Sequence, residues 1–179
     1  DKVNVLYCFD SKFWRMAAVS IESLLNAARD TTQITIYCMV APHTSGRRKI
    51  EKIIKSHKSG AGLVWREINP RENPFQNYEY SRWSPVIFYR CFAHRYFRDI
   101  DKLLYLDSDI LVCRDISELF NTDISDCVFG AVRDLAPVND RYHPQGRYVK
   151  KFAAEYLKNG PYYNSGVLLL NLRKMAEYE

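Results

Sequence analysis

No stretch of this 179-residue sequence resembles a membrane-spanning helix, because none of its apolar runs approaches roughly 18 residues. The first residues, DKVNVLYCF, lack a signal-peptide pattern and predict a strand instead. Internal repeats and low-complexity tracts are also absent, and the 7 glycines and 7 prolines are an ordinary number. We therefore expect a soluble globular protein with a single domain over residues 1–179.

Paired cysteines are absent as well. The five cysteines are odd in number, widely spaced and never arranged as CxxC. They are Cys8, Cys38, Cys91, Cys113 and Cys127. This pattern disfavours disulfide or zinc chemistry, and we expect buried thiols in a reducing compartment.

A strong excess of one charge is missing too, since the net charge is only +5. This mild excess slightly favours an anionic substrate or a membrane surface, and it does not indicate nucleic-acid binding. Several cations gather in a predicted helix over 45–60, which turns Ile50, Ile53 and Ile54 inward. We interpret these cations as the solvated face of the helix rather than as a phosphate or DNA site.

Strands alternate with helices along the chain. Short apolar runs predict strands at 3–9, 33–40, 62–68, 102–107, 127–132 and 165–172. Helical patterns lie at 13–25 (Met16, Val19, Ser20 and Leu24 share the spacing), 45–60, 84–98, 116–120 and 147–160. This alternation predicts an α/β fold, with a mixed, mostly parallel sheet covered by helices on both faces.

Polar side chains follow three of the predicted strands. Asp10 follows the first, Asp107 and Asp109 follow the fourth, and Arg133-Asp134 follow the fifth. Ligands of open α/β sheets bind outside the carboxyl ends of the strands. If these strands are neighbours, their polar ends converge on one crevice.

The stretch KLLYLDSDILV, residues 102 to 112, carries the strongest chemical signal. Extended backbone projects residues i and i+2 to the same side, so Asp107 and Asp109 can share one ligand while Ser108 points away. Two adjacent carboxylates repel unless a cation lies between them, and Mg²⁺ or Mn²⁺ commonly takes one or two carboxylates plus phosphates and waters. The alternative is a purely structural role, in which the two aspartates cap the next helix or pair with Arg114 and Lys102.

Two enzyme classes use an aspartate pair after a buried strand. In haloacid-dehalogenase-like phosphohydrolases the pair lies near the start of the fold and continues with Gly-Thr, whereas here it continues with Ile-Leu. In nucleotide-sugar glycosyltransferases the pair holds a metal ion on the donor diphosphate, which makes the nucleotide a better leaving group. The position of the pair in the chain and the residues that follow it favour the nucleotide-sugar glycosyltransferases.

The chain resembles glycosyltransferase family 8, whose retaining enzymes include glycogenin and bacterial lipopolysaccharide glucosyl- and galactosyltransferases. Four segments carry the resemblance in order: VLYCFDSKF with AAVSIESLL, SPVIFYRCF, DKLLYLDSDILV, and YYNSGVLLLNLRKM. The resemblance implies a glycosyltransferase-A type fold, a UDP-hexose donor (glucose or galactose) and an Mn²⁺ or Mg²⁺ cofactor. It most closely suggests the lipopolysaccharide branch.

The same resemblance implies roles for individual residues. Asp107 and Asp109 match the metal-binding pair, and Asp107 and Ser108 also lie against the nucleotide. The expected donor-binding residues in the first strand and loop are Tyr7, Cys8, Asp10, Ser11, Lys12 and Phe13. Arg90 matches an arginine that reaches the donor sugar or diphosphate. Asp134 and Asn164 match polar residues around the donor sugar and reaction centre, and no nucleophile is assigned.

The resemblance also implies partners and a place in the cell. The expected acceptor is a glycan or lipid-linked oligosaccharide, and we expect a cytoplasmic protein at the inner face of the cytoplasmic membrane. None of His43, His57, His94 and His143 matches the family's further metal ligand. We therefore expect the catalytic domain to continue beyond residue 179 with the acceptor-binding part. A non-catalytic nucleotide-sugar-binding module is the remaining alternative.

Overall fold

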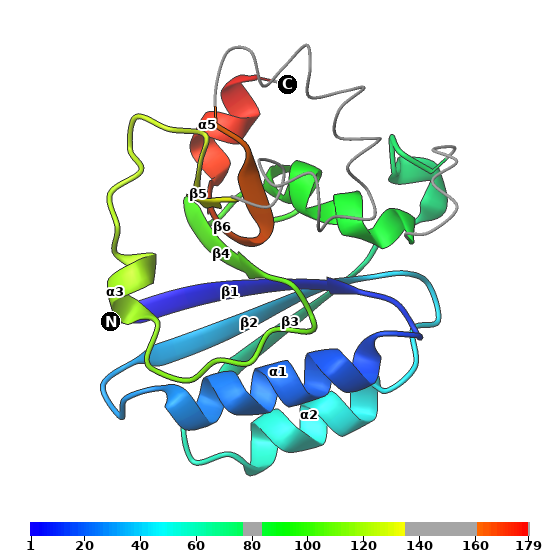
Figure 1. Cartoon of the computed structure of the whole chain (residues 1–179). Coiled ribbons are helices and arrows are strands. Elements are labelled where there is room, and N and C mark those ends of the chain that lie inside the picture. The colour runs from blue at the N-terminus through cyan, green and yellow to red at the C-terminus, as the bar shows by residue number, and fades with distance from the viewer. Residues whose placement is uncertain (77–83, 135–160, 179) are drawn as a thin grey trace, which may run out of the picture.

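The computed structural model describes residues 1–76, 84–134 and 161–178 (Figure 1). Its strands are β1 (Lys2–Phe9), β2 (Gln33–Val40), β3 (Gly62–Glu67), β4 (Lys102–Leu106), β5 (Phe129–Arg133) and β6 (Tyr163–Asn171). Its α-helices are α1 (Trp14–Ala27), α2 (Arg47–Ser56), α3 (Ser117–Phe120) and α5 (Leu172–Glu177). Two 3₁₀ helices, η1 (Pro70–Glu72) and η2 (Pro85–Arg95), complete the described elements. The helix predicted over 147–160 lies outside the described residues.

The strands form one mixed sheet in the order β3-β2-β1-β4-β6-β5. β1 pairs in parallel with β2 and with β4, and β2 pairs in parallel with β3. β6 runs antiparallel to both of its neighbours, β4 and β5. Because β6 is reversed, its first residues lie beside the carboxyl end of β4, where Leu106 is opposite Val167. The mixed, mostly parallel sheet is as predicted.

Helices cover both faces of the sheet, as predicted (Figure 1). On one face, α1 and α2 pack on a cluster that includes Val5, Ile21 and Leu104. On the other, η2 and α5 pack on a cluster that includes Leu6, Tyr89 and Tyr105. Alternate residues of β1 and β4 enter the two clusters because side chains alternate across a strand. The continuous apolar runs of the sequence therefore arise from strands that are buried on both sides.

The buried stripe of α1 differs from the predicted one. Of the four residues that share the predicted spacing, Ser20 and Leu24 are buried as a core-facing stripe requires, but Met16 and Val19 are 50% and 54% exposed. The buried residues of the helix are Ala17, Ala18, Ser20, Ile21, Leu24 and Leu25. Positions 17, 21, 24 and 25 form one helical stripe, and it is this stripe that faces the sheet. Ala17 and Ala18 pack beside the larger Ile21, Leu24 and Leu25 in this contact.

The segment predicted as a helix over 84–98 is the 3₁₀ helix η2, with a non-helical residue at Phe92. Pro85 opens it, as the sequence indicates, and the Ser84 hydroxyl caps it by accepting from the amide of Val86. Val86, Tyr89 and Phe92 are all buried, and they recur every third residue. A spacing of three matches the 3.0 residues per turn of a 3₁₀ helix, so one side of η2 packs continuously on the sheet.

All five cysteines are free, but only Cys8 and Cys38 are buried. Cys91, Cys113 and Cys127 are exposed, which corrects the expectation of buried thiols. Cys91 lies in η2, where it lines cavities together with Val128 and Met175, and the other two lie outside the helices and strands. Within the described ranges, no helix has both the length and the apolar character needed to cross a bilayer.

Candidate functional site

A cavity of about 360 Å³ opens where β1 and β4 end. Its lining comes from the β1 end (Cys8, Phe9, Asp10, Phe13), from η2 (Ser84, Val86, Ile87, Arg90), from the β4 end (Tyr105, Asp107, Ser108, Asp109) and from β6 (Ser165). Two parallel strands thus deliver their following residues to one place, which is the usual position of a ligand site in such a sheet.

The chain turns immediately after β4. β4 ends at Leu106, and the amide of Ile110 donates to the carbonyl of Asp107 over 3.3 Å. Asp107 and Asp109 both line the cavity, as predicted. Ser108 also lines it, with its hydroxyl 3.5 Å from the carbonyl oxygen of Cys8. The prediction that Ser108 points away is therefore wrong, because it assumed extended backbone where the chain forms a turn.

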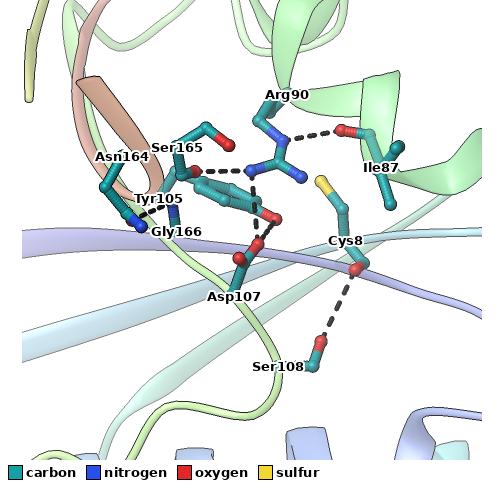
Figure 2. Close-up of polar contacts among 9 residues, drawn as sticks. All are labelled: Cys8, Ile87, Arg90, Tyr105, Asp107, Ser108, Asn164, Ser165 and Gly166. Carbon is teal, nitrogen blue, oxygen red and sulfur yellow. Dashed lines mark hydrogen bonds and ion pairs between the residues drawn. The ribbon is translucent and has the colours of Figure 1, made fainter. Parts of the chain in front are cut away.

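Arg90 compensates the charge of Asp107 (Figure 2). Its Nη1 atom lies 3.2 Å from Asp107 Oδ1 and donates to the carbonyl of Ser165 over 2.6 Å. Its Nε atom donates to the carbonyl of Ile87, also over 2.6 Å. Neither alternative partner considered from the sequence, Arg114 or Lys102, makes this pair. A cation 17 positions away along the chain makes it instead.

Tyr105 contacts both members of this pair. Its hydroxyl donates to Asp107 Oδ1, and the Cζ atom of Arg90 lies 4.1 Å from the centre of its ring. Burial, with help from Cys8 and Asp107, raises the pKa of the Tyr105 phenol, so the hydroxyl remains a donor. Tyr105 did not stand out in the sequence because it reads as an apolar residue of a core strand. The spacing of two between Tyr105 and Asp107 was the available signal.

Gly166 lies against the other oxygen of Asp107. Its carbonyl accepts from the amide of Asp107 over 2.8 Å, and its own amide donates to Asn164 Oδ1 over 2.8 Å. A Cβ atom at Gly166 would lie 2.9 Å from Asp107 Oδ2 and 3.1 Å from Asn164 Oδ1. A side chain at position 166 would therefore press on the Asp107 carboxylate in its present orientation, and glycine avoids this contact.

The donor set suits a hard divalent cation. Asp107 Oδ2 accepts no hydrogen bond within the described ranges, and Asp109 is exposed with no ion pair there. The described residues contain no cluster of three or more side chains that could hold a metal ion. Two carboxylates fit Mg²⁺ or Mn²⁺ when diphosphate and water supply the remaining oxygen ligands.

The other predicted site residues are divided between this cavity and its surroundings. Cys8, Asp10 and Phe13 line the cavity. Ser11 and Lys12 are exposed beside it, where Ser11 accepts from the amide of Ser45 and the Lys12 amide donates to Asp10. Burial raises the pKa of the Cys8 thiol far above its usual value, so Cys8 is a neutral group.

Three further predicted residues do not line this cavity. The Tyr7 side chain is fully buried on the α1 side of the sheet, with its hydroxyl 3.1 Å from Ser20 Oγ, so it does not reach the cavity. Asn164 lines a neighbouring, largely apolar cavity of about 500 Å³ together with Ile87 and Arg90. Asp134 follows β5, one strand further out than expected, where its amide donates to the carbonyl of Tyr162. The antiparallel β6 separates the ends of β4 and β5, which the sequence alone could not reveal.

Comparisons with known proteins agree with this architecture. The crystal structure of the galactosyltransferase LgtC, in complex with donor and acceptor sugar analogues, matches with a TM-score of 0.78 and 24% identity, over 99% of this chain and 60% of that chain. Mouse xyloside xylosyltransferase 1 matches with a TM-score of 0.69 and 19% identity, over 99% of this chain and 69% of that chain. These likenesses identify the fold as glycosyltransferase-A type.

Sequence relatives point the same way. The lipopolysaccharide 1,2-glucosyltransferase of Escherichia coli K12 is 34% identical over 178 residues, which are 98% of this chain and 49% of that protein. A putative glycosyltransferase of Haemophilus influenzae is 32% identical over 179 residues, which are 98% of this chain and 50% of that protein. This chain thus spans about half the length of these relatives. The model of the family described as "Glycosyl transferase family 8" matches residues 4–179, so the chain belongs to that family.

Proposed function

We propose that this protein is a metal-dependent retaining glycosyltransferase. It transfers a hexose, glucose or galactose, from a UDP-sugar to a glycan acceptor of the lipopolysaccharide core. The observation that carries the proposal is the pair Asp107 and Asp109 on one cavity at the strand ends, with Arg90 beside them. Membership of the family and the similarity to a lipopolysaccharide 1,2-glucosyltransferase support the substrate class.

Asp107 and Asp109 would hold the cation, Mn²⁺ or Mg²⁺, which when bound neutralises charge on the diphosphate and improves it as a leaving group. Arg90 supplies a fixed positive charge at the same end of the cavity, where an anionic donor is attracted. Phe9 and Phe13 offer apolar walls to the base and ribose, and Asp10 offers a carboxylate acceptor for their polar groups.

The donor sugar lies, in this proposal, toward β6, where Asn164 and Ser165 are the second and third residues of the strand. Asn164 and Asp134 are the polar residues assigned to its surroundings. No protein nucleophile is assigned, and the neutral Cys8 thiol is unsuited to that role. This arrangement leaves double displacement or front-face attack by the acceptor as the two routes to retention.

The direct test measures UDP release by the full-length natural protein from UDP-glucose and UDP-galactose, with and without Mn²⁺. We expect one of the two donors to be preferred, and release to depend on Mn²⁺ and on a lipopolysaccharide-core acceptor. Hydrolysis of a generic phosphomonoester without sugar transfer would favour a phosphohydrolase. UDP-sugar binding without any turnover would favour a non-catalytic binding module.

We further propose that the outer surface of α2 associates with an anionic membrane, at the inner face of the cytoplasmic membrane. Four cations of α2 are exposed, namely Arg48, Lys49, Lys52 and Lys55, and Glu51 is the helix's only acid. α2 lies beside α1 at the outside of the fold (Figure 1), and α1 exposes the apolar Met16 and Val19. Cations and apolar side chains together are the combination that anionic lipid surfaces attract.

Reversing three of these charges is expected to release the protein from anionic vesicles. Each cation near an anionic surface contributes about 1 kcal/mol, so Arg48→Glu, Lys52→Glu and Lys55→Glu together should weaken binding at least about tenfold. Sedimentation with phosphatidylglycerol vesicles measures this, with phosphatidylcholine vesicles for comparison. The matched control reverses Lys2, Arg71 and Arg173, three exposed cations outside α1 and α2. An equal loss in the control, or equal binding to both lipids, would contradict the proposal.

A further inference from the structure

The two oxygens of the Asp107 carboxylate have different surroundings. Oδ1 accepts from Tyr105 Oη and from Arg90 Nη1, so two protein donors converge on a single oxygen (Figure 2). Oδ2 faces Gly166, where the absent side chain leaves room, and it accepts no hydrogen bond from a described residue. The carboxylate is therefore held in one orientation by contacts to one of its ends.

The Tyr105 ring also supports the Arg90 guanidinium. The Cζ atom of Arg90 lies 4.1 Å from the ring centre, which is a close cation–π contact. Tyr105 itself is 1% exposed and packs in the core between β4 and η2, so its ring is firmly placed. A single rigid side chain thus makes two contacts: its hydroxyl donates to Asp107, and the face of its ring contacts Arg90.

A carboxylate that binds a cation from a fixed orientation loses less rotational freedom than one that is free to turn. With Oδ1 engaged by two donors, Oδ2 is the oxygen that remains for a cation. We propose that Tyr105 is a positioning residue, which commits Oδ1 of Asp107 to the protein and presents Oδ2 to the divalent cation of the donor complex. The inference deepens the proposed function and rests on its metal site.

The variant Tyr105→Phe isolates the hydroxyl, because it keeps the ring beneath Arg90 and the packing of the core. We expect it to weaken Mn²⁺ binding to the nucleotide-free protein by about tenfold, the lower end of the effect of losing a partner of a metal ligand. Electron paramagnetic resonance of free Mn²⁺ measures the Kd without any turnover. In the transfer reaction, the Mn²⁺ concentration for half-maximal rate should rise, while kcat at saturating Mn²⁺ stays within about twofold.

The matched control is Tyr96→Phe. It also removes a tyrosine hydroxyl that donates to a carboxylate, here Glu72 Oε2 at 3.1 Å, and Tyr96 does not line the donor cavity. It should leave the Mn²⁺ Kd unchanged. Thermal unfolding of both variants separates a loss of stability from a loss of metal affinity, and Asp109→Ala defines the Kd of a broken site.

Each outcome discriminates. An unchanged Mn²⁺ Kd in Tyr105→Phe, with Asp109→Ala impaired, overturns the role of Tyr105 and leaves the proposed function standing. A raised Kd in Tyr105→Phe, without any sugar transfer by the natural protein, supports the role of Tyr105 and overturns the proposed function. Mn²⁺ binding that is insensitive to Asp109→Ala overturns both.

Discussion

Asp109→Ala is expected to lower Mn²⁺-dependent release of UDP from the donor by at least about 100-fold. The metal contributes several kcal/mol to charge stabilisation in the transition state, and each 1.36 kcal/mol corresponds to a factor of ten in rate. Asp109 is exposed at the cavity, whereas one oxygen of Asp107 already accepts hydrogen bonds from Arg90 and Tyr105. Without Asp109, a single carboxylate oxygen remains for the cation. The measurement is UDP release by the full-length protein over a range of Mn²⁺ concentrations.

Folding should be unaffected by this substitution, because Asp109 makes no hydrogen bond or ion pair with a described residue. Surface substitutions of this kind usually change stability by less than about 0.5 kcal/mol. Asp126→Ala is the matched control, since Asp126 is also an exposed aspartate but lies outside the cavity. If Asp109→Ala retains activity near that of Asp126→Ala, the metal assignment is wrong.

Arg90→Met should reduce both stability and donor affinity. The substitution keeps the length of the aliphatic part of the side chain but removes the guanidinium. Asp107 and the carbonyls of Ile87 and Ser165 then lose their donor. Removing one member of a buried ion pair costs about 3–5 kcal/mol, but the Asp107 side chain is 37% exposed, so solvent screening reduces the loss. We expect roughly 1–3 kcal/mol in the free energy of unfolding, measured by denaturant titration. Titration with UDP should show weaker binding as well.

A double-mutant cycle tests whether the cost comes from the pair itself. If Arg90 acts through Asp107, Arg90→Met should cost less in an Asp107→Asn background than in the wild type. Arg173→Met is the control, since Arg173 pairs with Asp101 at 2.8 Å but both side chains are more than 70% exposed. Breaking that pair should leave the free energy of unfolding almost unchanged. Strict additivity of Arg90→Met and Asp107→Asn would show that the two side chains are not coupled.

The order and type of the elements followed from local patterns. Apolar runs of strand length predicted all six strands of the sheet, and Ser84-Pro85 marked the start of η2. Local patterns were less informative about which side of an element is buried. On α1 the pattern grouped Met16 and Val19 with the buried Leu24, yet Met16 and Val19 are exposed, and Ala17 and Ile21 are buried instead. Burial depends on what approaches from elsewhere in the chain, which spacing within one helix does not contain.

The candidate site was partly visible in the sequence. Asp107 and Asp109 were predicted to share one object, and both line one cavity. What balances the charge of Asp107 was predicted to be a cation from outside the protein, and this expectation was incomplete, because Arg90 already forms an ion pair with it. Such long-range pairing has no signature in spacing, since the two residues meet only when η2 packs across the end of β4.

The sequence by itself determined which residue types follow each strand, and therefore the kind of chemistry this protein can perform. It also determined that the chain alternates strands with helices, because hydrophobic periodicity is a local property. Only the tertiary structure decided that β6 runs antiparallel beside β4, which brings Ser165 and Gly166 to Asp107 and places one strand between the ends of β4 and β5. The physical reason is that strand order and direction are set by packing the whole sheet. The sequence of a single segment therefore does not contain the order or the direction of the strands.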